Sequence, residues 1–422
     1  MTVTDEQPGL EPRVVRDDSP TLPPRAEAVV RRRRIESRQR RITRMQAGVT
    51  ILFVVLLAAL VWLGYRATLE VGGGSDSRVT DPTAPGYLAT PVHTIVDSYV
   101  VTDDDGGYVT SLLVVPDSSG SGGTVVPLAS IMVLPEPETF LRDVYDAEGL
   151  EGFRSRLGDT LGFSIGSVRE VPVEAMVDLA DGLPIEVENP DPLIVPGEEG
   201  GDVRYPSGTL SIPPEGLAEF MAFEGADDPA PNQQIRLSQV WEELFARAEG
   251  RDHDGLPEGE ATEGAESPVF GEMVDQLAAG DVRFDSVPLY RQPLPGSIIV
   301  VAWMVDPQYI DGFVSKVVPL PTSPSPGRRP SVAVLNGSSD PDAVSAAVPK
   351  VVSGGGEVSV VGNAMSFDVD TTTVEYLYPE EAEAAERIAE QLGVEATEGS
   401  PPDNPDLDGV SVVVTLGSDL AP

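Results

Sequence analysis

Residues 331–356 read SVAVLNGSSDPDAVSAAVPKVVSGGG. The β-branched and apolar run at 331–335 predicts a strand, because such residues suit a buried pleated surface. The turn residues after it, the alanine-rich stretch from about Pro341 and the three closing glycines predict a helix with a defined start and end. A strand followed so closely by a helix is the building unit of an α/β fold.

The remainder of residues 331–422 continues this pattern. Strands are predicted at 357–361, 373–377 and 410–415, where short β-branched runs lie between turn signals. A helix is predicted at 379–392 (PEEAEAAERIAEQL), with Pro in its first turn and Gly just past its end. The order β-α-β-β-α-β predicts a small α/β domain.

Residues 90–318 predict a second and larger domain of mixed α/β structure, since strand and helix patterns alternate along it. An acidic stretch at 252–267 (DHDGLPEGEATEGAES) interrupts this domain and predicts a mobile surface loop. The predicted strands are 110–115, 124–134, 183–187 and 297–304, and the predicted helices are 140–161, 172–180, 217–223 and 237–248.

Turn-forming residues mark the limits of the larger domain. Residues 66–89 are rich in Gly, Pro and Ser and predict a tether. Residues 319–330 (PLPTSPSPGRRP) predict a semi-extended linker to the C-terminal domain at 331–422.

A membrane anchor is predicted at residues 47–65, AGVTILFVVLLAALVWLGY, which carry no charge. A helix of this length spans about 28 Å, close to the hydrocarbon thickness of a bilayer. Residues 1–46 hold eleven Arg and seven acidic residues, a net +4, whereas the whole chain has −41. The positive-inside rule therefore predicts a single-pass protein of the cell membrane, with a disordered cytoplasmic tail and its bulk outside the cell. A cleaved signal peptide is the alternative, although its apolar stretch is usually shorter and nearer the start.

Composition excludes several kinds of chemistry. The chain has no Cys and only two His, so thiol catalysis, disulfides, Cys-ligated zinc and His-rich metal sites are excluded. His93 lies in a predicted strand and is interpreted as a packed or surface residue. His253 lies in the acidic loop, where we expect it to be solvated.

Three passages resemble the LytR–CpsA–Psr family of cell-envelope proteins. Residues 159–188 (DTLGFSIGSVREVPVEAMVDLADGLPIEVE) are similar to the family's middle segment, and residues 208–244 have the layout of the segment after it. Residues 331–418 resemble the LytR C-terminal domain. The matches there are VAVLNGSS near the start, VVGNA at 360–364, TTVEY at 372–376 and VVVTLGSD at 412–419.

The resemblance implies an activity and its partners. Members of the family transfer a polyprenyl-pyrophosphate-linked glycopolymer to peptidoglycan, with Arg side chains on the pyrophosphate and acidic side chains holding a divalent metal. It therefore implies a cell-wall polymer or polyprenyl-linked glycan as partner, and Mg²⁺ as cofactor if the chain is active. No cofactor is expected otherwise. No nucleic-acid partner is expected, because no DNA-binding motif is present and the acidic outer part would repel DNA.

Most of the family's charged positions carry other residues in this chain. The stretch Tyr108–Ser111 lacks the acid expected before the first core strand, and Glu136 and Pro137 stand where an Arg and an Asp are expected. The family's paired Arg align with Ala222 and Glu224. Replacing Arg by Glu puts like charge beside a pyrophosphate, which opposes its binding.

Candidate site residues are consequently few. Arg236 falls where a family Arg is expected and is a candidate phosphate ligand. Asp103 and Asp105 are candidate metal ligands if their loop folds back toward the site, and a solvated turn is the alternative. No catalytic residue is assigned.

Three functions remain open from the sequence. The first is a catalytically degenerate accessory or binding protein in the attachment of cell-wall glycopolymers. The second is an active Mg²⁺-dependent phosphotransferase, which requires a cavity where at least two Arg and two carboxylates converge. Its candidate arginines are Arg142, Arg154, Arg204 and Arg236. The third is a transcriptional or signalling role, which no motif supports.

Overall fold

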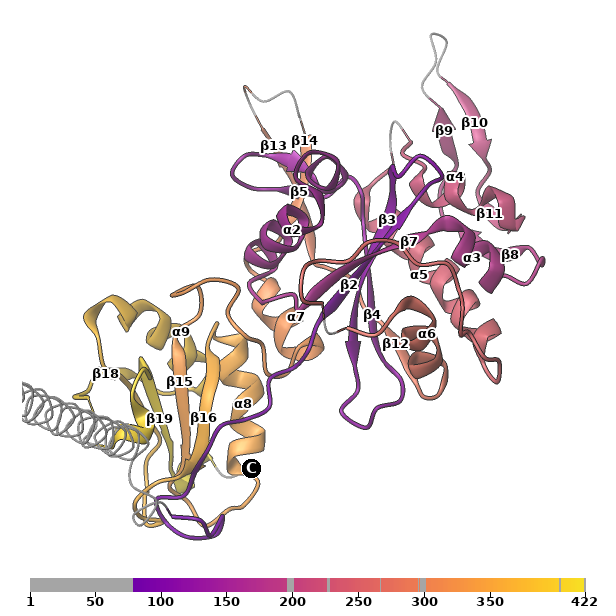
Figure 1. Ribbon diagram of the computed structural model, residues 1–422. Helices are drawn as coiled ribbons and strands as arrows, with labels where there is room; N and C mark the ends of the chain where they lie inside the picture. Colours follow the sequence, from indigo (N-terminus) through magenta and orange to yellow (C-terminus); the bar gives the residue numbers. More distant parts are fainter. Residues whose placement is uncertain are drawn as a thin grey trace, which may run out of the picture. The chain divides into compact units, whose positions relative to one another are not determined.

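A computed structural model describes residues 79–420 of the protein, apart from 196–200, 226–227, 266, 295, 297–300 and 402–403. By its internal contacts the chain divides into Met1–Arg78 and Val79–Pro422, and the described residues all belong to the second unit. Within this unit the chain forms two α/β domains (Figure 1). The predicted mixed α/β fold class is confirmed.

The described residues contain no helix that is both long and apolar enough to cross a bilayer. The predicted anchor at 47–65 and the predicted tail at 1–46 lie outside these residues, so both stay predictions.

The larger domain is built on a mixed five-stranded sheet in the order β12-β4-β3-β2-β7. Neighbouring strands among the central three are antiparallel to one another, whereas β12 runs parallel to β4 and β7 runs parallel to β2. The strands are β2 (Asp97–Thr102), β3 (Tyr108–Pro116), β4 (Gly123–Leu128), β7 (Ser167–Pro172) and β12 (Val282–Phe284).

Helices cover both faces of this sheet because its strands are apolar on both sides. In β3, Leu113 and Val115 join one apolar cluster, whereas Leu112 and Val114 join the other, as a period of two residues requires. The first face packs against α2 (Leu141–Leu161) and α7 (Ile310–Val317), and the second against α3 (Val173–Leu179), α4 (Leu217–Ala222), α5 (Ala230–Ala248) and α6 (Phe270–Ala278) (Figure 1).

Four small antiparallel pairs extend the larger domain beyond its central sheet, counted among the described residues. One of them, β13 with β14, also forms a wall of the candidate functional site. The pairs are β5 (Val133–Leu134) with β6 (Thr139–Phe140), β8 (Ile185–Asn189) with β11 (Gly208–Ile212), β9 (Leu193–Val195) with β10 (Asp202–Tyr205), and β13 (Leu289–Pro293) with β14 (Val301–Val305).

The C-terminal domain has a six-stranded sheet in the order β1-β16-β15-β19-β17-β18. Its three central strands, β16, β15 and β19, are parallel, and α8 and α9 pack against the sheet. Its elements are β15 (Ser331–Asn336), α8 (Ala343–Ser353), β16 (Glu357–Asn363), β17 (Thr373–Tyr376), α9 (Ala382–Leu392), β18 (Ala396–Glu398) and β19 (Val412–Leu416), together with β1 (Leu88–Ala89).

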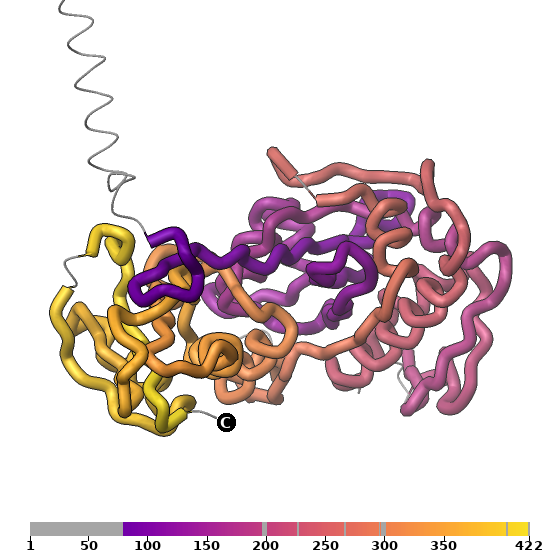
Figure 2. Tube along the Cα trace, turned by 90° about the horizontal axis from the view of Figure 1, so that it is seen from below, coloured from indigo at the N-terminus to yellow at the C-terminus, as the bar shows by residue number. Residues whose placement is uncertain are grey.

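The edge strand β1 comes from the segment that precedes the larger domain. Residues 79–89, here named the leading segment, lie beside the C-terminal sheet in both views (Figures 1 and 2). β1 pairs antiparallel with β16, and the Asn363 amide nitrogen donates to the carbonyls of Pro82 and Ala84 at 2.9 Å each. Position 362 must be glycine, because a Cβ there would collide with the Tyr87 carbonyl oxygen. The last part of the predicted tether is thus a strand of the C-terminal sheet.

The predicted linker is ordered and packed, and Arg329 is its anchor. The Arg329 side chain is 3% exposed and donates to the Gly162 carbonyl at 2.5 Å and to Asp311 at 2.9 Å, both in the larger domain. A further bond, of 3.3 Å, reaches the Val352 carbonyl at the end of α8. Burial lowers the pKa of Arg329, and the charge of Asp311 opposes that shift. One guanidinium group therefore joins the two domains.

Several predicted elements need correction. The predicted strand 124–134 breaks after Leu128, where Ser130 turns its hydroxyl group to other side chains. The helix predicted at 237–248 begins at Ala230, because Pro is compatible with a first helical turn. The acidic stretch at 252–267 is partly pinned, since Thr262 is buried and bonds to the Val168 amide.

We predict that Arg329→Met lowers the free energy of unfolding by roughly 3 kcal/mol, because it leaves Asp311 and the buried carbonyl oxygens without their hydrogen-bond donor. Urea denaturation of the full chain measures this. The neighbouring exposed Arg328 supplies the control: Arg328→Met should change the value by less than about 0.5 kcal/mol. Equal effects of the two variants would contradict the proposed role of the buried guanidinium.

We predict that Asp97→Asn stabilises the protein at pH 7. Burial raises the pKa of Asp97 above its ordinary 3.8, although the Ser167 hydroxyl group donates to it at 2.9 Å. A raised carboxyl pKa means that the ionised form costs stability, so the cost is present at neutral pH and disappears below about pH 3.8.

In urea denaturation, the Asp97→Asn variant should have a larger free energy of unfolding than the parent at pH 7, but not at pH 3.5. The exposed Asp81 is the control of opposite sign, because a hydrogen bond from the Thr83 amide lowers its pKa. Asp81→Asn should therefore not stabilise at pH 7. An Asp97→Asn variant that is less stable than the parent at pH 7 would refute the prediction.

Candidate functional site

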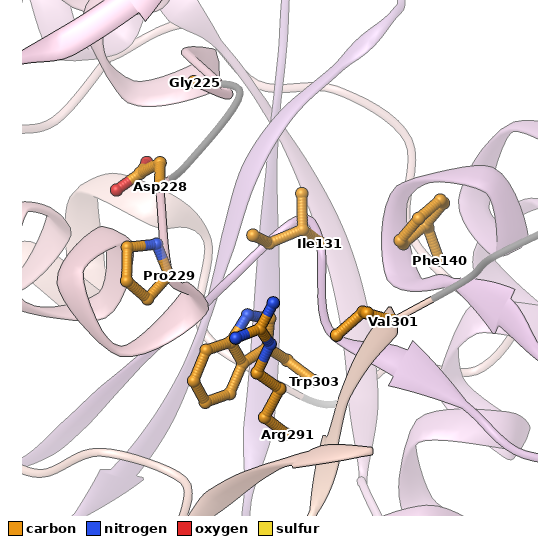
Figure 3. A pocket seen from close by; sticks show the side chains of 8 residues that line it. All are labelled: Ile131, Phe140, Gly225, Asp228, Pro229, Arg291, Val301 and Trp303. Carbon is orange, nitrogen blue, oxygen red and sulfur yellow. The ribbon is translucent and has the colours of Figure 1, made fainter. Parts of the chain in front are cut away.

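A pocket of about 340 Å³ lies where four segments of the larger domain meet. These are the β4–β5 connection, the start of α2, the chain just before α5 and the β13–β14 pair. We name it the Arg291 pocket (Figure 3). It is lined by Ile131, Phe140, Gly225, Asp228, Pro229, Arg291, Val301 and Trp303.

Arg291 is the cation that faces this pocket. It lies opposite Trp303 in the β13–β14 register, so the two side chains share one face of the pair. Figure 3 shows the guanidinium group beside the indole ring and directed toward Ile131. Among the described residues this guanidinium group has no ion-pair or hydrogen-bond partner. Arg291 therefore offers an available positive charge on an aromatic surface.

Two further arginines approach the same region, but each is paired with a carboxylate. Arg236 forms a two-pronged ion pair with Asp228, at 2.7 and 2.9 Å, and the two side chains are 2% and 3% exposed. Arg142, at the start of α2, forms an ion pair with Glu224. Both guanidinium charges are thus neutralised within the protein.

Uncharged polar side chains lie beside these two ion pairs. The hydroxyl group of Ser130, which is 3% exposed, donates to Glu224 at 2.8 Å and accepts from the Gln233 amide nitrogen at 2.9 Å. Ser130 therefore holds Glu224 in place beside Arg142. The break in the predicted strand at this residue is what directs its hydroxyl group here.

Arg236, the predicted phosphate ligand, lies next to the pocket without lining it. Its guanidinium group lies over the Phe220 ring at 5.9 Å, and its Nε has no hydrogen-bond partner in the described structure. Of the other candidate arginines, Arg154 and Arg204 form surface ion pairs with Glu151 and Glu219. The structure therefore brings two of the four candidates, Arg142 and Arg236, near one cavity.

The predicted metal ligands Asp103 and Asp105 lie in the turn between β2 and β3. Asp103 accepts hydrogen bonds from the backbone amides of Asp105 and Gly107 at 3.0 and 2.7 Å, so it closes the turn. Asp105 lines a separate acidic groove of about 720 Å³, without Lys or Arg among its lining residues. The structure does not bring these two residues to the Arg291 pocket.

A different group of acids lies close enough to share a cation. In the described part of the chain the carboxylates of Asp252, Asp254 and Asp275 come within 4.8 Å of one another. His253 contacts Asp275 through Nδ1 at 2.6 Å and is only 6% exposed. The expectation that His253 is solvated was wrong, because the ring packs beneath α6 and pairs with that helix's Asp275.

Two residues at positions where the resemblance implied charged side chains, Thr110 and Glu136, do not line the Arg291 pocket. Thr110 is 1% exposed and its hydroxyl group has no partner in the described structure. Glu136 is exposed. The residues of this candidate site that the sequence analysis did not identify are Arg291 and Trp303. The sequence signal for them was a pair of short strand-like stretches, LYRQP and VAWMV, which can place an Arg opposite a Trp in a hairpin.

Residues 329–420 match the family model described as LytR cell envelope-related transcriptional attenuator. This match confirms the predicted LytR C-terminal domain and covers all its strands except β1. A search of curated proteins found no match.

Solved structures show a weaker similarity. A transcriptional regulator from Enterococcus faecalis is 14% identical, with 54% of this chain and 89% of that chain covered and a TM-score of 0.39. TagT of Bacillus subtilis is 14% identical, with 57% and 93% covered and a TM-score of 0.37. A Streptococcus agalactiae protein is 14% identical, with 53% and 86% covered and a TM-score of 0.40.

We predict that Arg236→Met lowers the free energy of unfolding by roughly 3–5 kcal/mol, because it leaves the Asp228 carboxylate buried and unpaired. The double variant Arg236→Met, Asp228→Leu should recover most of this loss. Arg204→Gln, which breaks an exposed pair, is the control and should have little effect. A fully stable Arg236→Met variant would contradict the expected cost of leaving Asp228 buried and unpaired.

Proposed function

We propose, from a C-terminal domain that belongs to the LytR C-terminal family, that this is a single-pass protein of the cell envelope that binds an anionic cell-wall glycopolymer. The larger domain would be a LytR–CpsA–Psr-like domain that holds this polymer without transferring it. Residues 47–65 would form the anchor, with the tail in the cytoplasm and the chain after about residue 66 outside.

The observation that carries this proposal is the available guanidinium group of Arg291 beside Trp303. A guanidinium group binds phosphate or carboxylate oxygens through two parallel hydrogen bonds. The rings of Trp303 and Phe140 offer apolar faces of the kind that pack against the C–H groups of a sugar. A sugar phosphodiester or a sugar acid combines these two features, and 340 Å³ lies at the lower end of ligand-pocket volumes.

The charges beside the pocket oppose phosphoryl transfer. A pyrophosphate brings several negative charges, and its reaction needs cations that are free to stabilise them. In this structure Glu224 neutralises Arg142, and Asp228 neutralises Arg236. Among the described arginines at the pocket, Arg291 alone is left without a carboxylate partner, which suits a ligand with one negative charge at this position.

The carboxylates beside the pocket do not fit the Mg²⁺ that an active enzyme would use. Mg²⁺ needs oxygen ligands in near-octahedral geometry. Glu224 and Asp228 are each held by an arginine, and the close acidic group at Asp252, Asp254 and Asp275 does not line the pocket. We therefore derive no metal-dependent step for this site.

The alternative function is an active glycopolymer–peptidoglycan phosphotransferase. One observation favours it, namely that Arg142, Arg236 and Arg291 approach one cavity together with two carboxylates. It requires a ligand able to displace both carboxylates from their arginines.

We predict that the full chain binds a sugar-phosphate oligomer with phosphodiester links, measured by isothermal titration calorimetry. Arg291→Gln should weaken this binding roughly 10- to 100-fold, because it removes a charge-assisted pair of hydrogen bonds. Arg154→Gln is the matched control on the surface and should bind like the parent. Since Arg291 is exposed, its replacement should leave the fold intact.

A second assay separates the two functions. The full chain is incubated with Mg²⁺, a polyprenyl-pyrophosphate-linked glycan and peptidoglycan, and linked product is measured. Binding without product is the expected result. Product formation would establish the phosphotransferase. Equal binding affinity of the parent and the Arg291→Gln variant would remove the support for this pocket.

A further inference from the structure

A second cavity, of about 430 Å³, lies in the C-terminal domain at the ends of β15 and β16. We name it the Tyr87 pocket. One wall is the chain from Asn336 to Val344, which leads from β15 into α8. Another is the end of β16 with Asn363 and, further along, Phe367. The leading segment closes it with Tyr87 and its neighbours.

The position of this cavity in the sheet is a favourable one for a ligand. β15 lies between β16 and β19, and all three strands run parallel. The cavity lies beyond the carboxyl ends of β15 and β16 and is lined by residues at both ends. In open α/β sheets, ligands bind outside the carboxyl ends of the strands.

The lining is polar but has no charge. None of the residues around the cavity is Asp, Glu, Lys or Arg. The hydroxyl groups of Tyr87 and Ser339 and the amide oxygen of Asn363 have no hydrogen-bond partner among the described residues. These groups provide both donors and acceptors, and the Tyr87 and Phe367 rings supply apolar surface.

Other polar groups nearby are already used by the fold. The Asn336 amide oxygen accepts from the backbone and hydroxyl group of Ser338, both at 2.9 Å, and its amide nitrogen donates to the Asp340 carbonyl. These hydrogen bonds hold the turn at the end of β15 in place. They do not use the Ser339 hydroxyl group, which is therefore available to a ligand.

We propose that the Tyr87 pocket binds a neutral sugar unit of an envelope glycan. A sugar carries hydroxyl or acetamido groups and an apolar C–H face, which match the available polar groups and the two rings. The absence of charge in the lining disfavours phosphates, acids and cationic peptides. This site is independent of the Arg291 pocket, which lies in the other domain and selects an anion.

Binding at this site is coupled to the leading segment. Tyr87 is held by β1 and by the bond from the Asn363 backbone amide to the Tyr87 carbonyl at 2.8 Å. The residues that match the LytR C-terminal model, 329–420, do not include this wall. The pocket is therefore complete only when the segment before the larger domain is docked on the last domain.

The test uses the full chain and tetra-N-acetylchitotetraose, a neutral oligosaccharide, as the probe. Calorimetry should detect binding, and Tyr87→Ala and Phe367→Ala should each weaken it at least 10-fold. Ser339→Trp should abolish it by filling the cavity from an exposed position, without removing any packing. Tyr378→Ala is the matched control, because this tyrosine lies in the same domain and is 43% exposed.

Arg291→Gln distinguishes the two sites, since it should leave binding of the neutral probe unchanged while weakening the anionic one. The proposal is overturned if the parent does not bind the probe, or if Ser339→Trp binds it as the parent does. Loss of binding in Arg291→Gln would place the oligosaccharide in the other pocket and also overturn it.

Discussion

The buried guanidinium group of Arg329 bonds to residues of both domains, at three helices. Its partners are Gly162 just past α2, Asp311 in α7 and Val352 near the end of α8. Helix α2 begins beside Phe140 of the Arg291 pocket, and α8 begins beside Val344 of the Tyr87 pocket. An apolar cluster continues from α2 through α7 to α8, so the junction is packed as well as hydrogen-bonded. The predicted linker is therefore part of the core.

The sequence predicted the elements whose signals are local. In the C-terminal domain it placed β15, α8, β16, β17, α9 and β19, because their apolar periods and end signals are clear. It missed β1 and β18, which are two and three residues long and acquire their structure by pairing with strands remote in the chain. No local pattern in Leu88–Ala89 indicates a partner at Val361–Gly362.

The candidate site was less predictable because its chemistry depends on pairing. Alignment with a family pattern identified Arg236 as a candidate phosphate ligand, but it could not show that Asp228 neutralises the charge of this arginine. In the same way, Glu224 reads as a lost arginine, whereas in the structure it neutralises Arg142 and bonds to Ser130. Arg291 was missed because its exposed guanidinium group gains its importance from Trp303 across the hairpin and from Ile131 in a distant segment.

The proposal of a binding protein in place of an enzyme rests on two carboxylates, Glu224 and Asp228. A ligand that used Arg236 would have to displace Asp228, and an unpaired buried carboxylate costs roughly 3–5 kcal/mol. A pyrophosphate could offset that cost through its own bonds to the arginine, but the displaced Asp228 would then stand beside it with the same sign of charge, in a site too dry to screen the repulsion. A singly charged ligand on Arg291 meets neither cost, because both internal pairs stay closed. The arrangement of charge, and not the number of arginines, is therefore the reason for proposing that the pocket holds a glycan without transferring it.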